Sequence, residues 1–318
     1  MKLLITSPAF GQPHMEPLIE FAKSAADEVV INPYGRTLTV EELKEIWDGT
    51  DAVVAGLEPY TAEVLAQAPD TLKAICRFGV GYDSVDLAAA KAKGIAVTNT
   101  PGTNSDAVAD LAIGMMIAIA RHIPQGDKSV RDGSWKRYTG LSMEGKKLGI
   151  LGLGAIGKGV AKRAAGFSMD IYAYDPYFDR DFAEKYNVKS AEMEEIFTQC
   201  DYITLHLPVL PETVGIINRD TLAKMKPSAY LINAARGPLV NEDDLYDALK
   251  NGRIMGAALD VYSQEPLKDS PLFQLDNIVV LPHIGGNTRE AAVAMGRLAI
   301  DNALAVLKGE ACQYIVNR

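Results

Sequence analysis

Short apolar runs alternate with amphipathic segments along the first hundred residues. The runs lie at residues 3–6, 29–31, 52–55, 73–76 and 96–98. Such alternation is typical of βαβ units, in which helices cover a parallel sheet. Between the runs, Thr39 and Glu42 have the spacing of a capping box, and Asp86 can cap a helix that stops at Gly94. This part of the chain therefore predicts a small α/β lobe.

A second series of apolar runs follows a change in pattern. Residues 104–120 include the nearly all-apolar segment AVADLAIGMMIAIA, which predicts a helix buried on most of its sides. A polar, glycine-containing stretch then extends from residue 121 to 147. Six further runs lie at residues 147–151, 170–174, 202–207, 229–234, 256–259 and 278–281. Six strands are the number expected for a doubly wound sheet.

The last apolar positions, from Val293 to Leu307, recur at helical spacing, and we expect Asn287 and Glu290 to form the capping pair of this helix. A tail of this length is too short for a domain of its own, so it must pack on one of the two lobes. The pattern as a whole predicts an α/β fold of two Rossmann-like lobes, each a doubly wound parallel sheet, with a cleft between them.

Composition narrows the classes of function. The chain has 318 residues, is 48% hydrophobic and carries a net charge of −9. The acidic balance argues against nucleic-acid binding, which needs clustered Lys and Arg, so an anionic substrate must be held by local groups. The three cysteines lack metal-ligand spacing and fit buried thiols in a reducing cytoplasm. We expect no metal, no signal peptide and no membrane span, because the most apolar stretch, 111–120, is too short.

A glycine-rich turn gives the strongest single signal. In LGILGLGAIGK, Gly152, Gly154 and Gly157 form G-x-G-x-x-G between an apolar run and a helical segment. The first glycine allows the tight turn, the second lets backbone approach a pyrophosphate, and the third lets helix and strand pack closely. The N–H groups of Ala155 and Ile156 suit a diphosphate, because they lie at a helix N-terminus.

Asp175 follows the next apolar run, eighteen residues beyond Gly157. A carboxylate at that place accepts hydrogen bonds from the adenosine ribose and repels a 2′-phosphate. The turn and this acid together predict NAD, in preference to NADP, as the cofactor.

The four histidines are not equally suited to chemistry. His14 lies in a polar loop and His122 at a helix end, so both are expected to be structural. His206 is either a core histidine or a residue lining the cofactor crevice, and the sequence leaves this open. His283 follows the apolar run NIVVLP, at a carboxyl strand end, where ligands bind in open α/β sheets.

Glu265 and Arg236 fall at carboxyl strand ends of the same lobe as His283. Oxidation of an alcohol needs a base that accepts the hydroxyl proton, and histidine titrates in the right range. A carboxylate bonded to the imidazole fixes its tautomer and favours its charged form. A guanidinium can hold a substrate carboxylate and polarise a carbonyl oxygen. Taken singly, Arg236 would be a surface ion-pair residue and Glu265 a solvated loop acid. Their coincidence with His283 favours a catalytic set.

Seven stretches, in order, resemble the D-isomer-specific 2-hydroxyacid dehydrogenase family over essentially the whole chain. They are RFGVGYDSVDL, NTPGTNSDAVADLAIGMM, LGILGLGAIGK, LHLPVLPETVGIIN, LINAARGPLVNEDDL, GAALDVYSQEP and LPHIGGNT. The resemblance implies a discontinuous substrate-binding domain, residues 1–99 plus 285–318, and an NAD-binding domain, residues 100–284. It also implies a homodimer, with the helix at 104–120 near the subunit contact.

The resemblance extends to individual residues. It implies that Arg236, Glu265 and His283 are catalytic, and that Val80 and Gly81 bind the substrate carboxylate together with Arg236 and His283. The cofactor contacts that the motif and the resemblance jointly suggest are Gly152, Gly154, Ala155, Ile156, Gly157, Asp175, His206, Pro208, Thr213, Ala234, Arg236, Asp260, His283 and Gly285.

Within the family the chain most resembles the phosphoglycerate dehydrogenases, through KRYTGLSMEGKKLGILGLGAIG and YDPY. Glu58, however, stands where those enzymes tend to place an arginine for the substrate phosphate, and Arg36 or Arg77 would have to supply that charge. The sequence also ends at Arg318, so we expect no appended regulatory domain. Glyoxylate or hydroxypyruvate is therefore a rival substrate, and an NAD-sensing binding protein without turnover is a rival function.

Overall fold

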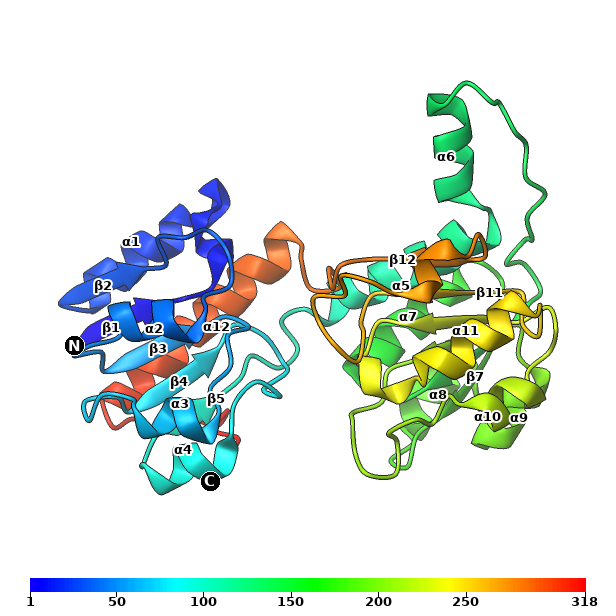
Figure 1. Cartoon of the computed structure of the whole chain (residues 1–318). Helices are drawn as coiled ribbons and strands as arrows, with labels where there is room; N and C mark the ends of the chain where they lie inside the picture. Colours follow the sequence, from blue (N-terminus) through cyan, green and yellow to red (C-terminus); the bar gives the residue numbers. More distant parts are fainter. The chain divides into compact units, whose positions relative to one another are not determined.

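A computed structural model describes all 318 residues of the chain, which divides into two units. The first unit comprises Met1–Asn104 and Gly286–Arg318, and the second comprises Ser105–Gly285. Both are built on parallel sheets with helices on each face, so the predicted α/β class is confirmed (Figure 1). Each unit is described by itself below.

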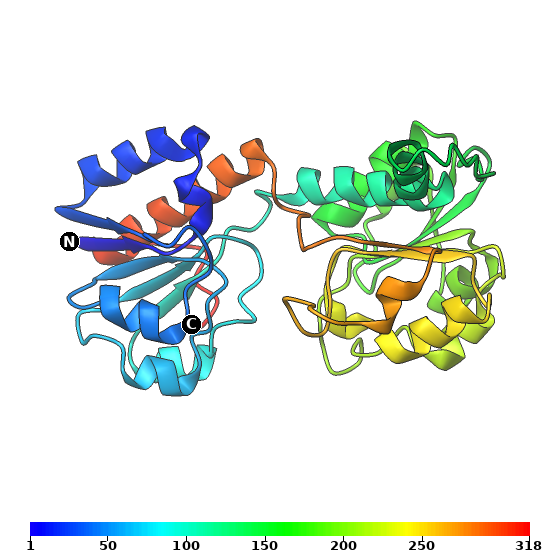
Figure 2. The same ribbon diagram turned by 45° about the horizontal axis from the view of Figure 1, so that its top comes forward.

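The first unit contains a five-stranded sheet in the order β2-β1-β3-β4-β5. Its strands are β1 (Lys2–Ile5), β2 (Glu28–Ile31), β3 (Ala52–Ala55), β4 (Ala74–Arg77) and β5 (Ala96–Thr98). Its helices are α1 (Glu16–Ala25), α2 (Val40–Ile46), α3 (Ala62–Ala66), α4 (Leu87–Ala92) and α12 (Arg289–Leu307). Figure 2 shows α1 and α12 on one face of this sheet and α2, α3 and α4 on the other.

Alternate side chains of each strand divide between two cores of this unit. On β1, Leu4 packs with Leu43 of α2, whereas Leu3 and Ile5 pack with Ala299 of α12. The capping box predicted for Thr39 and Glu42 forms, and Asp86 accepts a hydrogen bond from the third residue of α4. Strands with two buried faces explain the continuous apolar runs of the sequence.

The second unit contains a seven-stranded sheet in the order β12-β11-β10-β9-β6-β7-β8. Its strands are β6 (Lys147–Leu151), β7 (Asp170–Tyr174), β8 (Val188–Ser190), β9 (Tyr202–Leu205), β10 (Tyr230–Asn233), β11 (Gly256–Leu259) and β12 (Ile278–Val280). Helices α5 (Ser105–Ala120), α7 (Ala155–Ala165) and α8 (Arg180–Tyr186) pack on one face. Helices α9 (Met193–Gln199), α10 (Arg219–Lys224) and α11 (Glu242–Lys250) pack on the other.

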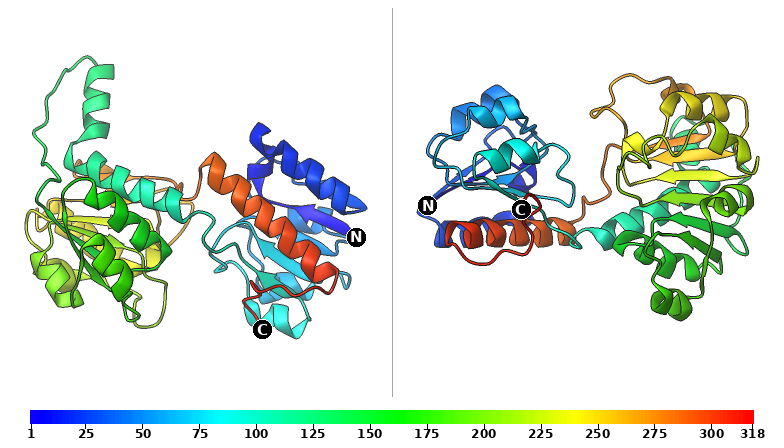
Figure 3. Two further views of the ribbon diagram at one scale, coloured as in Figure 1. Left: turned by 180° about the vertical axis from the view of Figure 1, so that it is seen from behind. Right: turned by 90° about the horizontal axis from the view of Figure 1, so that it is seen from below.

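Strand order reverses between β6 and β9, and ligands of doubly wound sheets bind outside the carboxyl ends of strands at such a point. Because the sheet is parallel, the segments after β10, β11 and β12 leave it at the same edge as those after β6 and β9. The right view of Figure 3 shows this sheet with its helices on both faces.

Two expectations about elements were wrong, and one helix was not predicted. The second sheet has seven strands, not six, because β8 is a three-residue edge strand with only Val188 buried. The polar stretch after α5 contains helix α6 (Ile123–Arg131), which projects from the second unit with one buried side chain (Figures 1 and 3). Helix α12 begins at Arg289, so its cap is Thr288, which accepts from Ala291 N–H; Asn287 and Glu290 do not form the cap.

The three cysteines are free and buried, as expected. No single helix is long and apolar enough to cross a membrane; α5 and α6, bent by 62° at their junction, pass that test only as a pair, on length and composition.

Candidate active site

The glycine-rich turn follows β6 directly and begins α7. Gly152 has φ of +99°, and a Cβ there would lie 2.7 Å from the carbonyl carbon of His206, so this position accepts only glycine. A Cβ at Gly157 would overlap the carbonyl oxygen of Gly152. These contacts press the turn against both the next helix and the segment after β9, as the sequence pattern predicts.

Gly154 differs from its two neighbours because a Cβ there would meet no atom within 4 Å. It is the N-cap of α7, and no side chain caps the helix. The first-turn N–H groups, which include those of Ala155 and Ile156, therefore face open space beside a residue without a side chain. This arrangement fits the pyrophosphate of a dinucleotide, because free amides and the helix dipole favour an anion.

Asp175 lies at the end of β7 and is tied to the glycine-rich turn. Its Oδ2 accepts from Leu153 N–H at 2.7 Å, and its Oδ1 accepts from Tyr177 N–H at 2.7 Å. An ionised carboxylate has further lone pairs, so both oxygens can still accept from ribose hydroxyls.

His206 begins the segment after β9. Its Nε2 lies 2.9 Å from Thr204 Oγ1, while its Nδ1 is buried and has no partner. Burial lowers the pKa of His206 to about 3, so the imidazole is neutral. Two residues on, Pro208 O accepts from Thr213 Oγ1 at 2.7 Å, and the same hydroxyl accepts from Leu210 N–H. His206 thus lies at the switch point of the sheet, with a buried Nδ1 that has no hydrogen-bond partner.

His283 and Glu265 form a short side-chain contact at this edge of the sheet. His283 Nδ1 lies 2.6 Å from Glu265 Oε2, and Glu265 Oε1 accepts from Tyr262 N–H at 2.9 Å. Burial by itself would raise the pKa of Glu265, but the bonds from His283 and Tyr262 and the charge of Arg236 outweigh it and lower that pKa. Glu265 is therefore an anion bonded to the Nδ1 side of the imidazole, which leaves Nε2 for a substrate.

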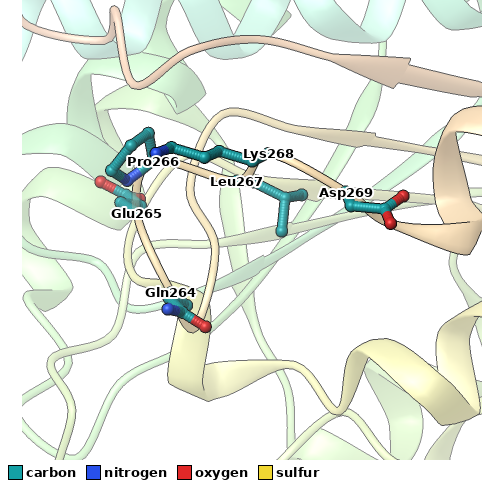
Figure 4. A pocket seen from close by; sticks show the side chains of 6 residues that line it. All are labelled: Gln264, Glu265, Pro266, Leu267, Lys268 and Asp269. Atoms are coloured by element: carbon teal, nitrogen blue, oxygen red, sulfur yellow. The ribbon is translucent and has the colours of Figure 1, made fainter.

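The loop that carries Glu265 extends from β11. Figure 4 shows Gln264 to Asp269, which surround a pocket of about 310 Å³. The pocket is enclosed by one loop alone, so we regard it as a property of the loop and not as a ligand site.

Asp260 holds the backbone beyond His283. Its carboxylate accepts from Ile284 N–H at 2.8 Å and from Gly285 N–H at 2.7 Å, and its side chain is buried. His283 itself has φ of +54°, a conformation that a non-glycine residue rarely adopts. The two bonds to Asp260 help to maintain this conformation, because they fix the peptides that follow.

Arg236 follows β10 in a turn shaped by a buried asparagine. Asn233 Oδ1 accepts from Ala235 N–H at 3.0 Å, and Asn233 Nδ2 donates to Arg236 O at 2.9 Å. Arg236 Nη1 donates to Ala235 O, and Ala234 lies buried in the same turn. Asn233 is a structural residue of the site that the sequence pattern did not reveal, because it sits inside an apolar run.

Val80 and Gly81 belong to the first unit, in the turn after β4. Their carbonyl oxygens accept from Asn99 Nδ2 at 2.8 Å and from Arg77 Nε at 3.2 Å. With the carbonyl groups held by Asn99 and Arg77, the amides are available for an anion.

Glu58 lies elsewhere than its sequence position suggested. The side chain is fully buried, where it accepts from Thr6 Oγ1, from Gly56 N–H at 3.0 Å and from Tyr60 Oη at 2.8 Å. It is therefore part of the interior of the first unit and does not present an acid to solvent. Arg36 donates to both oxygens of Glu42.

Comparison with known proteins gives the family. Residues 113–285 match the model of the D-isomer specific 2-hydroxyacid dehydrogenase NAD binding domain, so NAD is the cofactor of the second unit. The chain is 44% identical to D-3-phosphoglycerate dehydrogenase of Methanocaldococcus jannaschii, over 95% of the chain and 58% of that protein. It is 40% identical to D-3-phosphoglycerate dehydrogenase of Homo sapiens, over 89% of the chain and 53% of that protein. The chain spans about half the length of the curated relatives it matches.

Solved structures agree over nearly the whole chain. A protein from Thermus thermophilus has a TM-score of 0.86 at 36% identity, covering 99% of this chain and 100% of that one. A glyoxylate reductase from Paecilomyes thermophila has a TM-score of 0.85 at 31% identity, covering 99% and 98%. With the glycine-rich turn and the Glu265–His283 pair in place, the chain belongs to the family of D-isomer specific 2-hydroxyacid dehydrogenases.

Proposed function

We propose that the chain is an NAD-dependent oxidoreductase that interconverts a D-2-hydroxy acid and its 2-oxo acid. The observation that carries this proposal is the 2.6 Å contact between His283 Nδ1 and Glu265 Oε2. This pair lies at the carboxyl edge of the sheet whose β6–α7 turn fits a dinucleotide. An imidazole oriented by a carboxylate beside a nicotinamide site is the arrangement that proton transfer coupled to hydride transfer needs.

Each residue has one task in this scheme. NAD supplies or takes up the hydride when it is bound. During oxidation His283 removes the hydroxyl proton through Nε2, and Glu265 stabilises the imidazolium that results. In the reverse direction the imidazolium returns this proton to the carbonyl oxygen. The Arg236 guanidinium binds the substrate carboxylate and polarises the carbonyl group, because it combines charge with a forked set of donors.

The remaining contacts are also part of the proposal. The first unit would bind substrate, with the amides of Val80 and Gly81 donating to its carboxylate. The second unit would bind NAD through the turn at 152–157, Asp175, the segment 206–213 and the Asp260–Gly285 region.

For the substrate, 3-phosphoglycerate and 3-phosphohydroxypyruvate are our first candidates, because the curated relatives at 40–44% identity are named for that activity. The second candidate is glyoxylate or hydroxypyruvate. It is favoured by the likeness to a glyoxylate reductase, and by Arg36, whose guanidinium is bound to Glu42.

The test is a panel of 2-oxo acids with NADH or NADPH, read as loss of absorbance of the reduced cofactor. It includes 3-phosphohydroxypyruvate, hydroxypyruvate, glyoxylate and pyruvate. His283→Gln should lower kcat by roughly 10² to 10⁴. Full activity in that variant would overturn the catalytic assignment. Tight NADH binding without turnover of any acid would instead favour an NAD-sensing protein.

A homodimer and a cytoplasmic location remain predictions. The dimer is supported by apolar side chains exposed on and after α6, namely Ile123, Val130 and Trp135, the last 68% exposed. Light scattering on the purified chain gives the mass in solution, and a monomer at micromolar concentration would contradict the prediction.

A further inference from the structure

The backbone at Tyr262 and Ser263 is held from several directions at once. Tyr262 N–H donates to Glu265 Oε1 at 2.9 Å, and Ser263 N–H donates to Glu242 Oε1 at 2.7 Å. On the other side, Gly237 packs so closely that a Cβ there would overlap the Tyr262 carbonyl group and the Ser263 nitrogen. These two residues therefore form the meeting point of the loops after β10 and β11.

Tyr262 also reaches the strand that leads to His283. Its hydroxyl donates to Leu281 O at 3.0 Å, two residues before His283, and the side chain is buried. One residue thus contacts Glu265 through its amide and the approach to His283 through its side chain. Any movement of the Tyr262 backbone would change both halves of the Glu265–His283 pair.

Glu242 lies in the first turn of α11, where acids commonly stabilise the helix dipole. Asp243 and Asp244 occupy the same turn, yet they do not bond to the loop after β11. Asp243 is exposed and makes no hydrogen bond, while Asp244 accepts from Arg219 N–H. Only Glu242 extends from α11 to the loop after β11, so the dipole alone does not explain its contact with Ser263.

We propose that Glu242 is a positioning residue for the Glu265–His283 pair, a role that rests on the proposed function. By fixing the Ser263 amide, Glu242 fixes the orientation of the preceding residue, whose N–H holds Glu265 Oε1. Oε2 is then directed to His283 Nδ1. Gly237 contributes by having no side chain, because this lets the Arg236 turn lie against the same backbone. The three groups assigned to the chemistry are therefore aligned by one contact between loops.

Two substitutions of Glu242 separate the effect of its side-chain length from the effect of its charge. Glu242→Gln keeps an oxygen at the same distance but removes the charge. Glu242→Asp keeps the charge at the start of α11, but it shortens the side chain by one methylene, so that the bond to Ser263 is lost. Asp243→Ala is the matched control, because it removes an acid from the same helical turn without touching the loop.

We expect Glu242→Asp to lower kcat about 10-fold, the smaller end of the loss found for residues that orient metal-binding histidines, with the KM for NADH nearly unchanged. Glu242→Gln and Asp243→Ala should stay close to wild type. A Glu242→Gln variant as impaired as Glu242→Asp would overturn the proposal, because an oxygen kept in place to accept from Ser263 N–H would then not preserve activity. Wild-type kcat in Glu242→Asp would overturn it as well.

An NMR measurement tests the same contact without turnover. The chain has four histidines, so the Nδ1 proton of His283 can be assigned by its loss in His283→Gln. This signal should persist in Glu242→Gln and Asp243→Ala, and should broaden or disappear in Glu242→Asp. An unchanged signal in Glu242→Asp would refute the positioning role. If the wild type reduces no 2-oxo acid, the proposed function fails, but the NMR comparison still decides whether Glu242 aligns the pair.

Discussion

Gly154 and Gly157, three residues apart in one turn, should respond in opposite ways to the same added methyl group. At Gly157, a Cβ would overlap the Gly152 carbonyl oxygen and would lie 3.1 Å from its carbonyl carbon and 3.2 Å from Ile150 Cγ2. Two of these three atoms are backbone, so no rotamer change relieves the contact. At Gly154, φ is −71° and no atom lies within 4 Å of the new methyl group.

The magnitudes follow from these surroundings. Overpacking of this kind costs about 1–3 kcal/mol, so Gly157→Ala should lower the Tm by several degrees, at about 2–4 °C per kcal/mol for a unit of this size. Gly154→Ala should change stability by less than about 1 kcal/mol, since alanine adopts this backbone conformation readily. Its methyl group would stand beside the N–H groups that receive the pyrophosphate. We therefore expect NADH binding to weaken at least about 10-fold, or roughly 1.4 kcal/mol.

Thermal unfolding followed by circular dichroism measures the first effect, and titration of NADH fluorescence measures the second. The decisive result is that each variant changes a different property, Gly157→Ala the Tm and Gly154→Ala the affinity for NADH. If Gly154→Ala bound NADH as tightly as wild type, the diphosphate would not approach this glycine. If Gly157→Ala unfolded at the wild-type temperature, the close packing of turn and helix would be refuted.

Three further results are expected. Burial lowers the pKa of His206 from 6.5 to about 3, so between these pH values the unfolded chain binds a proton at this residue and the folded chain does not. The free energy of unfolding should therefore fall by about 2 kcal/mol between pH 7 and pH 5. Urea unfolding of His206→Gln should show a weaker pH dependence than that of the wild type. Asp175→Ala should raise the ratio of kcat/KM for NADPH to that for NADH, and unchanged selectivity would assign this role to another residue. Asp260→Asn offers one acceptor oxygen to the two amides of Ile284 and Gly285, so we expect a loss of about 1.5–3 kcal/mol in local stability, measured as faster hydrogen exchange at Gly285 N–H. Equal exchange rates at Gly285 N–H in Asp260→Asn and the wild type would contradict this prediction.

Elements with a strong local cause could be predicted from the sequence. Thr39 and Glu42 cap α2 because both partners lie within four residues of each other. Central strands such as β3 and β9 were visible because they are buried on two faces and therefore continuously apolar. The glycine-rich turn could be recognised because its steric demands fall on three fixed positions.

Elements that are stabilised mainly by a neighbouring element could not be predicted from the sequence. Strand β8 exists only as an edge added to β7, and two of its three residues are exposed, so no apolar pattern marks it. Helix α6 buries no apolar side chain against the second unit, since Ser129 is its one buried residue, so no core-facing pattern marks it. At the end of the chain, both Asn287 and Thr288 can cap a helix, and only the residue at which α12 begins decides between them.

The residues of the candidate site also divide into those that could be predicted from the sequence and those that could not. His283, Glu265 and Arg236 have side chains suited to acid–base chemistry and anion binding, and could be selected on that basis. The residues that hold them act through bonds to the main chain, Glu242 to the distant Ser263 and Asn233 within its own turn. Such contacts leave no periodic pattern in the sequence, because a buried polar side chain in a strand looks like an interruption of that strand.

The carboxylates of this site share one feature, which is that they are held by the main chain. Asp175 accepts from the amide of Leu153, Asp260 from the amides of Ile284 and Gly285, and Glu265 from the amide of Tyr262. Every residue except proline offers that same donor. These bonds therefore need the acids but not the side chains of the partner residues, so a homologous sequence can change the half-buried Ile284 and keep this arrangement of charges.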